Sequence, residues 1–275
     1  MSFNFKCPVC GGLLSDGDKT LRCENNHCFD KAKQGYVNLL QSQKSSKKRH
    51  GDDTLMVKAR TQFLEQGYYF CLLEGIVEAI KPFVKPQLTL ADLGCGECWY
   101  TKGIYDYLTG EGSAVEICGI DISKQALISA SKRCPDFHLA VASTSDLPLA
   151  DNSCDIVVSV FAPCSENEIR RVLKSDGVWI KAMPLERHLM GLKSVIYEKP
   201  YENTVNRNVP EGFELNNYRE IRANITVTGE DTDNLFKMTP YYYKTSEEDQ
   251  KKIKEMQSLC TEIEFGICTY TTTSL

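Results

Sequence analysis

The stretch LTLADLGCGECWY at residues 88–100 decides the fold that this sequence predicts. It begins as an apolar run typical of a buried strand and continues into a turn that contains Gly94 and Gly96. Glycines allow the chain to turn sharply and allow a ligand to approach the backbone, and the residues that follow favour a helix N-terminus. A ligand site at the carboxyl end of this strand is therefore expected.

Strands and helices alternate on the carboxyl side of this stretch. Further short strands are expected as VEICGIDI, HLAVAS, DIVVSVFA and GVWIKAMP, at residues 115–122, 138–143, 155–162 and 177–184. Helices are expected near residues 101–108, 124–133 and 166–173. This alternation predicts an α/β fold in which a mostly parallel sheet carries helices on both faces.

The pattern divides the chain into three expected regions. Residues 1–40 contain cysteines and glycine turns and are expected to form a compact unit. Residues 41–80 comprise a polar, basic linker followed by a helical pattern from about residue 53. Residues 81–275 form the α/β unit, and its tail is less regular. In the tail we expect a strand at 221–228, a helix at 229–238, a charged helix near 246–259 and a final strand at 264–271.

The composition favours a protein of the reducing cytoplasm. The sequence has no apolar N-terminal leader and no run of eighteen apolar residues, so secretion and membrane spanning are not expected. Its thirteen cysteines are interpreted as reduced thiols together with a metal site. The net charge is −5, but residues 1–60 hold eleven basic against six acidic side chains. This basic front is either a phosphate-binding surface or an ordinary solvated face.

Two pairs of metal-ligand residues stand within the first thirty positions. Cys7-x2-Cys10 and, twelve residues later, Cys23-x3-His27 place two ligands on each of two tight turns, as structural zinc requires. A unit of about forty residues has too small a core to fold alone, and metal binding can supply the missing free energy. Cys28 could replace His27 as the fourth ligand, but His27 is favoured. The alternative to the whole site is a set of buried free cysteines.

The acid at the end of the second strand indicates which ligand the glycine turn binds. Asp121 closes this strand in GIDIS and would lie beside the turn, where a carboxylate can accept both hydroxyls of a ribose. A dinucleotide fingerprint would include a third glycine. Asp92 before the turn and Glu97 after it would repel a pyrophosphate but tolerate a sulfonium with an amino group. The motif DLGCG together with Asp121 is the pattern of class I methyltransferases, so S-adenosyl-L-methionine is favoured over a dinucleotide.

Two further strand ends point to the same edge of the sheet. Ser143 follows the third strand and is expected near the adenine of the donor, although loop capping would explain it as well. Phe161 stands in VFAPC at the end of the fourth strand, where an exposed aromatic can stack on a flipped-out base. The alternative for Phe161 is a core aromatic at the end of a strand.

Taken together, these residues resemble the bacterial 23S rRNA (guanine-N1)-methyltransferases. The resemblance covers nearly the whole chain. It includes CPVC, CENNHCFD, DKAKQGYVNLL, KKRHGDD, MVKARTQFLEQGYY, LADLGCGE, GIDIS, VFAPC, PLERHLMGLKSVIY and LFKMTPYYY. The motifs GYVNLL and RHLMGLK are not general features of methyltransferases, so together with the Cys/His front they make the resemblance specific.

The resemblance implies a small zinc-binding N-terminal domain joined to a Rossmann-like methyltransferase domain, usually in a homodimer. It implies that one structural zinc is held by Cys7, Cys10, Cys23 and His27. It implies that the methyl donor contacts Tyr69, the turn from Gly94 to Trp99, Asp121 and His188. From spacing alone, Tyr69 could instead be a core aromatic and His188 a loop histidine.

At one position the chain departs from the pattern of this family. The family usually has glycine after the acid of GCGE, whereas this chain has Cys98, followed by Trp99 and Tyr100. If the backbone at this position needs a positive φ, a cysteine would be strained there. The departure bears on how tightly the donor binds and not on which donor is bound.

The implied reaction is transfer of the methyl group of S-adenosyl-L-methionine to N1 of a guanine in a stem-loop of 23S rRNA. The target base must be unpaired or extruded before it can react. Basic side chains of the linker would hold phosphates beside the pocket: Lys44, Lys47, Lys48 and Arg49. The sequence singles out no catalytic residue. The alternatives are a small-molecule methyltransferase of the quinone or sterol type and a non-enzymatic zinc adaptor that binds RNA.

Overall fold

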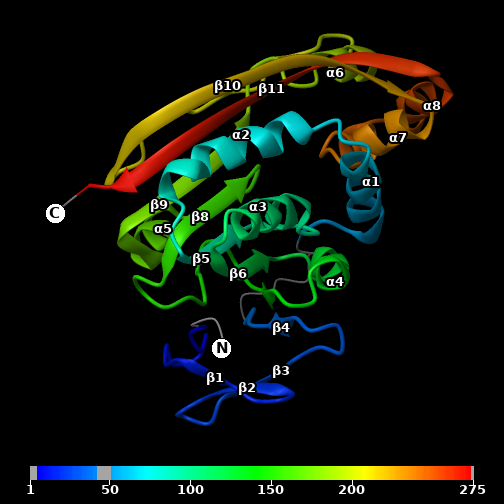
Figure 1. Cartoon of the computed structure of the whole chain (residues 1–275). Coiled ribbons are helices and arrows are strands. Elements are labelled where there is room, and N and C mark those ends of the chain that lie inside the picture. Colours follow the sequence, from blue (N-terminus) through cyan, green and yellow to red (C-terminus); the bar gives the residue numbers. More distant parts are fainter. Residues whose placement is uncertain (1–4, 42–50, 274–275) are drawn as a thin grey trace.

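The computed structural model of the chain describes residues 5–41 and 51–273. The small sheet of these residues is antiparallel and consists of β1 (Leu14–Asp16), β2 (Thr20–Cys23) and β3 (Cys28–Asp30). It lies at the opposite end of the molecule from a long hairpin formed by β10 (Phe213–Thr228) and β11 (Ser258–Thr272) (Figure 1). The hairpin belongs to a large sheet, and the sequence motifs predicted to bind the methyl donor lie in the part of that sheet between the hairpin and the small sheet.

The centre of the large sheet is parallel. Its strands are β4 (Val37–Asn38), β5 (Gln87–Leu93), β6 (Ala114–Asp121), β7 (His138–Val141), β8 (Cys154–Val160) and β9 (Leu173–Pro184). The strand order is β10-β11-β9-β8-β5-β6-β7-β4, and only the pairs β9–β11 and β10–β11 within it are antiparallel. In β5, Leu88 and Leu90 pack in one apolar core while Ala91 and Leu93 pack in another, so both faces of the strand are buried. The predicted α/β fold is confirmed.

Helices cover the sheet and connect its strands (Figure 1). They are α1 (Thr54–Glu65), α2 (Phe70–Ile80), α3 (Trp99–Gly110), α4 (Lys124–Arg133), α5 (Glu166–Val172), α6 (Met190–Ile196), α7 (Glu230–Lys237) and α8 (Glu247–Glu255), with 3-10 turns at Lys81–Phe83 and Tyr242–Lys244. Within the two described ranges, no helix is both long and apolar enough to cross a lipid bilayer.

The helical pattern that begins near residue 53 forms two helices. Asp53 caps α1 by accepting a hydrogen bond from the backbone N–H of Met56 at 3.0 Å. The chain turns between α1 and α2, where Gly67 adopts a φ of 80°. α1 then packs against α7, while α2 packs against β9, β10 and β11. The turn places Tyr69, the residue just before α2, where it packs against Phe265 of β11.

The hairpin β10–β11 is much longer than the sequence predicted. Strands were expected only at residues 221–228 and 264–271, because only those parts show an apolar pattern. Most of β10 is exposed on the outer edge of the sheet, so its polar side chains give no alternation to recognise. The expected charged helix near residues 246–259 ends at Glu255, because Leu259 pairs with Val227 in the hairpin.

The N-terminal unit is built into the large sheet rather than merely attached to it. β4 pairs in parallel with β7, so Val37 lies opposite Ala140. Phe5 forms an antiparallel bridge with Leu149, and the backbone N–H of Lys6 donates to the carbonyl of Pro148 at 2.9 Å. A domain boundary at residue 40 stays a prediction, but these pairings fix the orientation of the small sheet relative to the large one.

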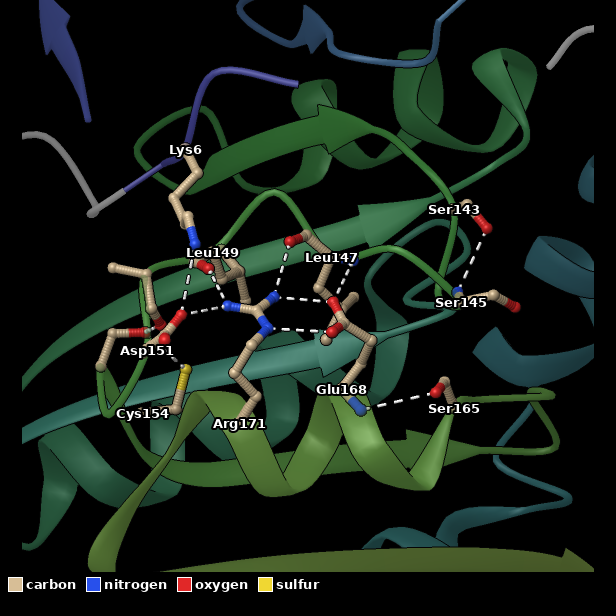
Figure 2. Close-up of polar contacts among 12 residues, drawn as sticks. Lys6, Ser143, Ser145, Leu147, Leu149, Asp151, Cys154, Ser165, Glu168 and Arg171 are labelled. Atoms are coloured by element: carbon tan, nitrogen blue, oxygen red, sulfur yellow. Dashed lines mark hydrogen bonds and ion pairs between the residues drawn. The ribbon is translucent and has the colours of Figure 1, made fainter. Parts of the chain in front are cut away.

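A polar network supports this attachment (Figure 2). Arg171 on α5 donates to the carboxylates of Glu168 and Asp151 at 2.6–2.9 Å. Its guanidinium also donates to the backbone carbonyls of residues 147 and 149 at 2.9 and 2.7 Å. Lys6 reaches from the N-terminal segment to the same Asp151 at 3.3 Å. α5 therefore holds residues 147–151 in place, and this loop pairs with the N-terminal segment.

Candidate active site and zinc centre

Four side chains converge between the two turns of the N-terminal unit. The candidate ligand atoms of Cys7, Cys10, Cys23 and His27 all lie within 4.8 Å of one another. Nδ1 of His27 lies 3.6 Å from Sγ of Cys7 and 3.3 Å from Sγ of Cys23, and the sulfurs of Cys10 and Cys23 are 3.7 Å apart. Tetrahedral zinc with bonds of 2.0–2.3 Å needs ligand atoms about 3.3–3.8 Å apart, so these four residues fit the ion.

The fold directs His27 and not Cys28 toward the other ligands. The turn between Cys23 and His27 closes when Asn26 adopts a φ of 62° and donates its backbone N–H to the carbonyl of Cys23 at 2.9 Å. Cys28 already belongs to β3, and its exposed sulfur accepts a hydrogen bond from Nε of Arg22 at 3.1 Å. Cys28 is therefore not part of the cluster that Cys7, Cys10, Cys23 and His27 form among the described residues.

A cavity of about 470 Å³ opens at the carboxyl ends of β5, β6 and β8. Its lining includes most of the residues expected to contact the donor: Asp92, Gly94, Gly96, Glu97, Trp99, Asp121 and Ser143. Gly94 is required at its position, because a Cβ there would lie 2.4 Å from Cβ of Ala162 and the backbone φ is 78°. We call this space the donor cavity.

Asp121 is held in a fixed orientation at the rim of the donor cavity. The backbone N–H of Gly96 donates to one carboxylate oxygen at 2.9 Å, and the N–H of Ser123 donates to the other at 2.7 Å. Burial raises the pKa of Asp121, while the two backbone donors act in the opposite direction. Each oxygen keeps a second lone pair, so the carboxylate can still accept the two hydroxyls of a ribose.

The donor cavity contains buried polar atoms that need a partner. In the part of the chain that the structure describes, four such atoms around it have no hydrogen-bond partner: Arg60 Nη2, Asp92 Oδ1, Glu97 Oε1 and Tyr100 Oη. Buried polar atoms in folded proteins are rarely left unpaired. Their concentration at this place indicates a polar ligand with donor groups for the carboxylates and an acceptor for the arginine. The methionine end of S-adenosyl-L-methionine has both.

Asp92 has a raised pKa, and we expect this to make donor binding sensitive to pH. Burial raises the pKa of its carboxyl from 3.8 to about 7, although Thr101 opposes this by donating to Oδ2 at 2.6 Å. The folded state therefore binds this proton more tightly than the unfolded chain, so the carboxyl lowers the stability of the free protein as pH rises from about 4 to about 7. The ionised form that attracts a cationic ligand dominates only above about pH 7.

We expect the affinity for S-adenosyl-L-methionine to rise about tenfold between pH 6 and pH 8, because the fraction of ionised Asp92 rises by that factor across a pKa of about 7. Titration calorimetry at several pH values measures this. Asp92→Asn should bind more weakly at pH 8 and should lose the slope. A slope that persists in Asp92→Asn would assign the pH dependence to another group.

Cys98 occupies the strained backbone position that the sequence suggested. It adopts φ 60° and ψ 32° just before α3. Its side chain is fully buried in a cluster with Leu127 and Leu139 and does not line the donor cavity. A donor contact at Cys98 stays a prediction. A left-handed backbone costs an L-residue roughly 1–2 kcal/mol. The buried thiol offsets part of this cost.

Cys98→Gly should change the free energy of unfolding by less than about 1 kcal/mol, because the lost packing is offset by relief of the backbone strain. The matched control is Cys134→Gly, which removes a thiol from the same cluster at an ordinary φ of −135°. It should be the less stable variant by about 1 kcal/mol. Urea denaturation of both proteins measures the difference. Equal losses would show that Cys98 is not strained.

A second cavity of about 630 Å³ adjoins the first. Both are lined by Arg60, Tyr100 and Phe161, so these side chains stand at the boundary between them. Phe161 is 42% exposed and adopts a φ of 55°, an uncommon conformation for a bulky residue. Strain of this kind concentrates at functional sites. The exposure speaks against the interpretation of Phe161 as a core aromatic.

Tyr69 and His188, expected to contact the donor, line the second cavity beside the donor cavity, so their contact with the donor stays a prediction. The backbone N–H of Glu264 donates to Nδ1 of His188 at 3.2 Å. Burial lowers the pKa of His188 to about 3, so the ring is neutral and its proton must be on Nε2. Nε2 lies 3.3 Å from the hydroxyl of Tyr69 and donates to it. The hydroxyl proton of Tyr69 is then left to donate to a third group.

The basic residues predicted to hold RNA phosphates lie outside the described residues: Lys44, Lys47, Lys48 and Arg49. Arg60 and Tyr100 were not predicted as site residues, but the fold brings both of them to both cavities. One feature of the sequence could have pointed to Arg60. It is a charged residue on α1 that lies between the buried positions Val57 and Phe63.

Comparison with known proteins matches both parts of the chain. The family model described as "RlmA, N-terminal", a zinc ribbon, matches residues 5–48, and the one described as "Methyltransferase domain" matches residues 91–180. The Bacillus subtilis (strain 168) protein named "Putative 23S rRNA (guanine-N(1)-)-methyltransferase YxjB" is 31% identical over 275 residues, or 96% of this chain and 95% of that protein. The Streptomyces fradiae 23S rRNA (guanine(748)-N(1))-methyltransferase is 35% identical over 190 residues, or 68% of this chain and 65% of that protein. The chain therefore belongs to the family of 23S rRNA (guanine-N1)-methyltransferases.

Proposed function

We propose that this chain transfers the methyl group of S-adenosyl-L-methionine to N1 of a guanine in a stem-loop of 23S rRNA. The observation that carries the proposal is the pair of adjoining cavities, because a transferase must hold donor and acceptor side by side. Among the described residues, the donor cavity combines the carboxylate of Asp121 with buried polar atoms that have no hydrogen-bond partner, and Phe161 stands at its boundary with the second cavity. The names of the two relatives describe the same modification of 23S rRNA.

The donor cavity fits the chemical groups of S-adenosyl-L-methionine. Asp121 would accept the ribose hydroxyls, Ser143 would lie near the adenine, and Trp99 would pack beside the glycine turn. The free carboxylate oxygens of Asp92 and Glu97 would accept hydrogen bonds from the amino group. When bound, the donor supplies a methyl group that its positively charged sulfur has already activated. The protein's task is therefore to place the two reactants and to exclude water.

The second cavity would receive the guanine. Phe161 offers an exposed ring for stacking, and the hydroxyl of Tyr69 offers a proton to an acceptor atom of the base. The attacking nitrogen, the methyl carbon and the sulfur must lie nearly in line, which requires the base to enter across this boundary. His188 does not take the N1 proton, because its Nε2 already carries one and its pKa is about 3. It acts by orienting Tyr69. The proton that leaves N1 would pass to water, and the donor would leave as the neutral thioether S-adenosylhomocysteine.

The zinc-bearing unit would set which guanine reaches the cavity. It is rigidly joined to the loop that contains Ser143 through β4 and through the bridge at Leu149. A cavity of about 240 Å³ lies at this junction and shares Ser143 with the donor cavity. We include in the proposal that the basic residues 44–49 hold RNA phosphates, that the chain acts as a homodimer and that it works in the cytoplasm.

Incubation with labelled donor tests the class of substrate. The protein should label 23S rRNA from cells that lack this modification, and it should leave a panel of quinones and sterols unlabelled. Labelling of a small molecule in place of RNA would support the small-molecule alternative. Donor binding without labelling of any substrate would contradict the proposed transfer, and RNA binding without donor binding would support the adaptor.

A further inference from the structure

Arg60 on α1 is held between two carboxylates at the boundary of the two cavities. Its Nε donates to Oε2 of Glu97 at 2.8 Å, and its Nη1 forms an ion pair with Asp52. Burial opposes its charge, but the two carboxylates outweigh this and raise the pKa of the guanidinium further above its usual range. The arginine is therefore charged at every relevant pH and fixed in orientation.

The third nitrogen of this guanidinium is directed toward the donor site. Nη2 of Arg60 is buried and has no hydrogen-bond partner among the described residues. It lies 3.0 Å from the position that a Cβ would take on Gly96, which has a φ of 56° in the donor turn. Two nitrogens of the planar guanidinium, Nε and Nη1, therefore bind carboxylates of the protein, and Nη2 presents its N–H groups beside the glycine turn.

The charges around the donor cavity define what Arg60 can bind. Its lining contains four acidic side chains: Asp52, Asp92, Glu97 and Asp121. Arg60 is the cationic residue among the described residues that line this cavity. A ligand with two positive centres and one carboxylate would place the positive centres near the acids. Its carboxylate would have Arg60 as a cationic partner there, and a charge-assisted bond of this kind is strong.

We propose that Arg60 binds the carboxylate of the methionine end of the donor through Nη2. This inference rests on the proposed function, since it takes S-adenosyl-L-methionine as the donor. It assigns to α1 a direct part in donor binding, so the helix that follows the basic linker also closes one side of the donor cavity. A structural role would instead limit Arg60 to joining Asp52 to Glu97.

The experiment compares S-adenosyl-L-methionine with its decarboxylated analogue, which keeps the adenosine, the sulfonium and the amine. Titration calorimetry is performed with the wild-type protein, with Arg60→Gln and with Arg60→Lys. Lys58→Gln is the matched control, because Lys58 is an exposed cation on the same helix. Far-ultraviolet circular dichroism and thermal unfolding establish that each variant is folded.

Arg60→Gln should weaken binding of S-adenosyl-L-methionine about 10- to 100-fold and should change binding of the decarboxylated analogue less than about threefold. Arg60→Lys should lie between wild type and Arg60→Gln, and Lys58→Gln should match wild type. Equal losses for both ligands would overturn the inference in favour of the structural role, and so would no loss for either. If the wild-type protein binds neither ligand, the proposed function fails first.

Discussion

Gly94→Ala is expected to lower the affinity for S-adenosyl-L-methionine about 100-fold or more and to remove methyl transfer at ordinary donor concentrations. The new Cβ would lie 2.4 Å from Cβ of Ala162, in a backbone conformation with φ 78° that alanine rarely adopts. The turn must move to accept it. That movement would displace the backbone N–H of Gly96, which fixes Asp121 at 2.9 Å. Calorimetry and a transfer assay with labelled donor measure the two effects.

Two controls separate this effect from a general loss of folding. Gly110→Ala changes a glycine in the last turn of α3. Apart from its chain neighbours and the helix's own backbone, no atom of the described residues lies within 4 Å of the added Cβ, so this variant should bind the donor normally. The double variant Gly94→Ala with Ala162→Gly removes the steric overlap but keeps the strained φ, so it should recover part of the affinity. Donor binding by Gly94→Ala within threefold of wild type would contradict the role given to this turn.

His27→Ala is expected to reduce the zinc content from one ion per chain to nearly none, whereas Cys28→Ser should keep it. Three remaining ligands cannot close a structural site, and the small sheet depends on the metal because it has little core of its own. The free energy at stake is large, about 10 kcal/mol or more in isolated zinc modules. Elemental analysis after dialysis measures zinc, and limited proteolysis measures folding of residues 5–41.

The same two variants differ in a second observable. Loss of zinc should free β4 from β7 and the N-terminal segment from Leu149, so His27→Ala should also weaken RNA binding. Cys28→Ser removes only an exposed sulfur that accepts from Arg22. If Cys28→Ser loses zinc and His27→Ala retains it, the assignment of the fourth ligand is wrong.

Local patterns in the sequence were sufficient for the parallel sheet and for the zinc ligands. A buried parallel strand needs an unbroken apolar run, and ligands on two tight turns need short fixed spacings, so both appear within a few residues. The strain at Cys98 could be foreseen from the resemblance, because the family usually has glycine at this position and glycine tolerates a positive φ. Where the thiol points could not, because that depends on packing against α4 and β7.

Features that depend on distant residues could not be predicted. Tyr69 and His188 meet across 119 positions, and their hydrogen bond is oriented by the backbone of Glu264. Arg60 has the spacing of an ordinary helix residue, and only the fold brings it to Glu97. Most residues of β10 are polar and exposed, so the sequence of this strand shows no alternation between apolar and polar residues. In each case the deciding interaction is absent from the local sequence.

The position of the methyl group on the base tests the central claim most directly. Undermodified 23S rRNA is incubated with the protein and S-adenosyl-L-methionine, digested to nucleosides and analysed by mass spectrometry against standards of the methylated guanosines. We expect 1-methylguanosine as the single new nucleoside, in an amount of about one per RNA, and none with Gly94→Ala. Methylation at another atom of guanine, on another base or on no nucleoside would contradict this account of the two cavities.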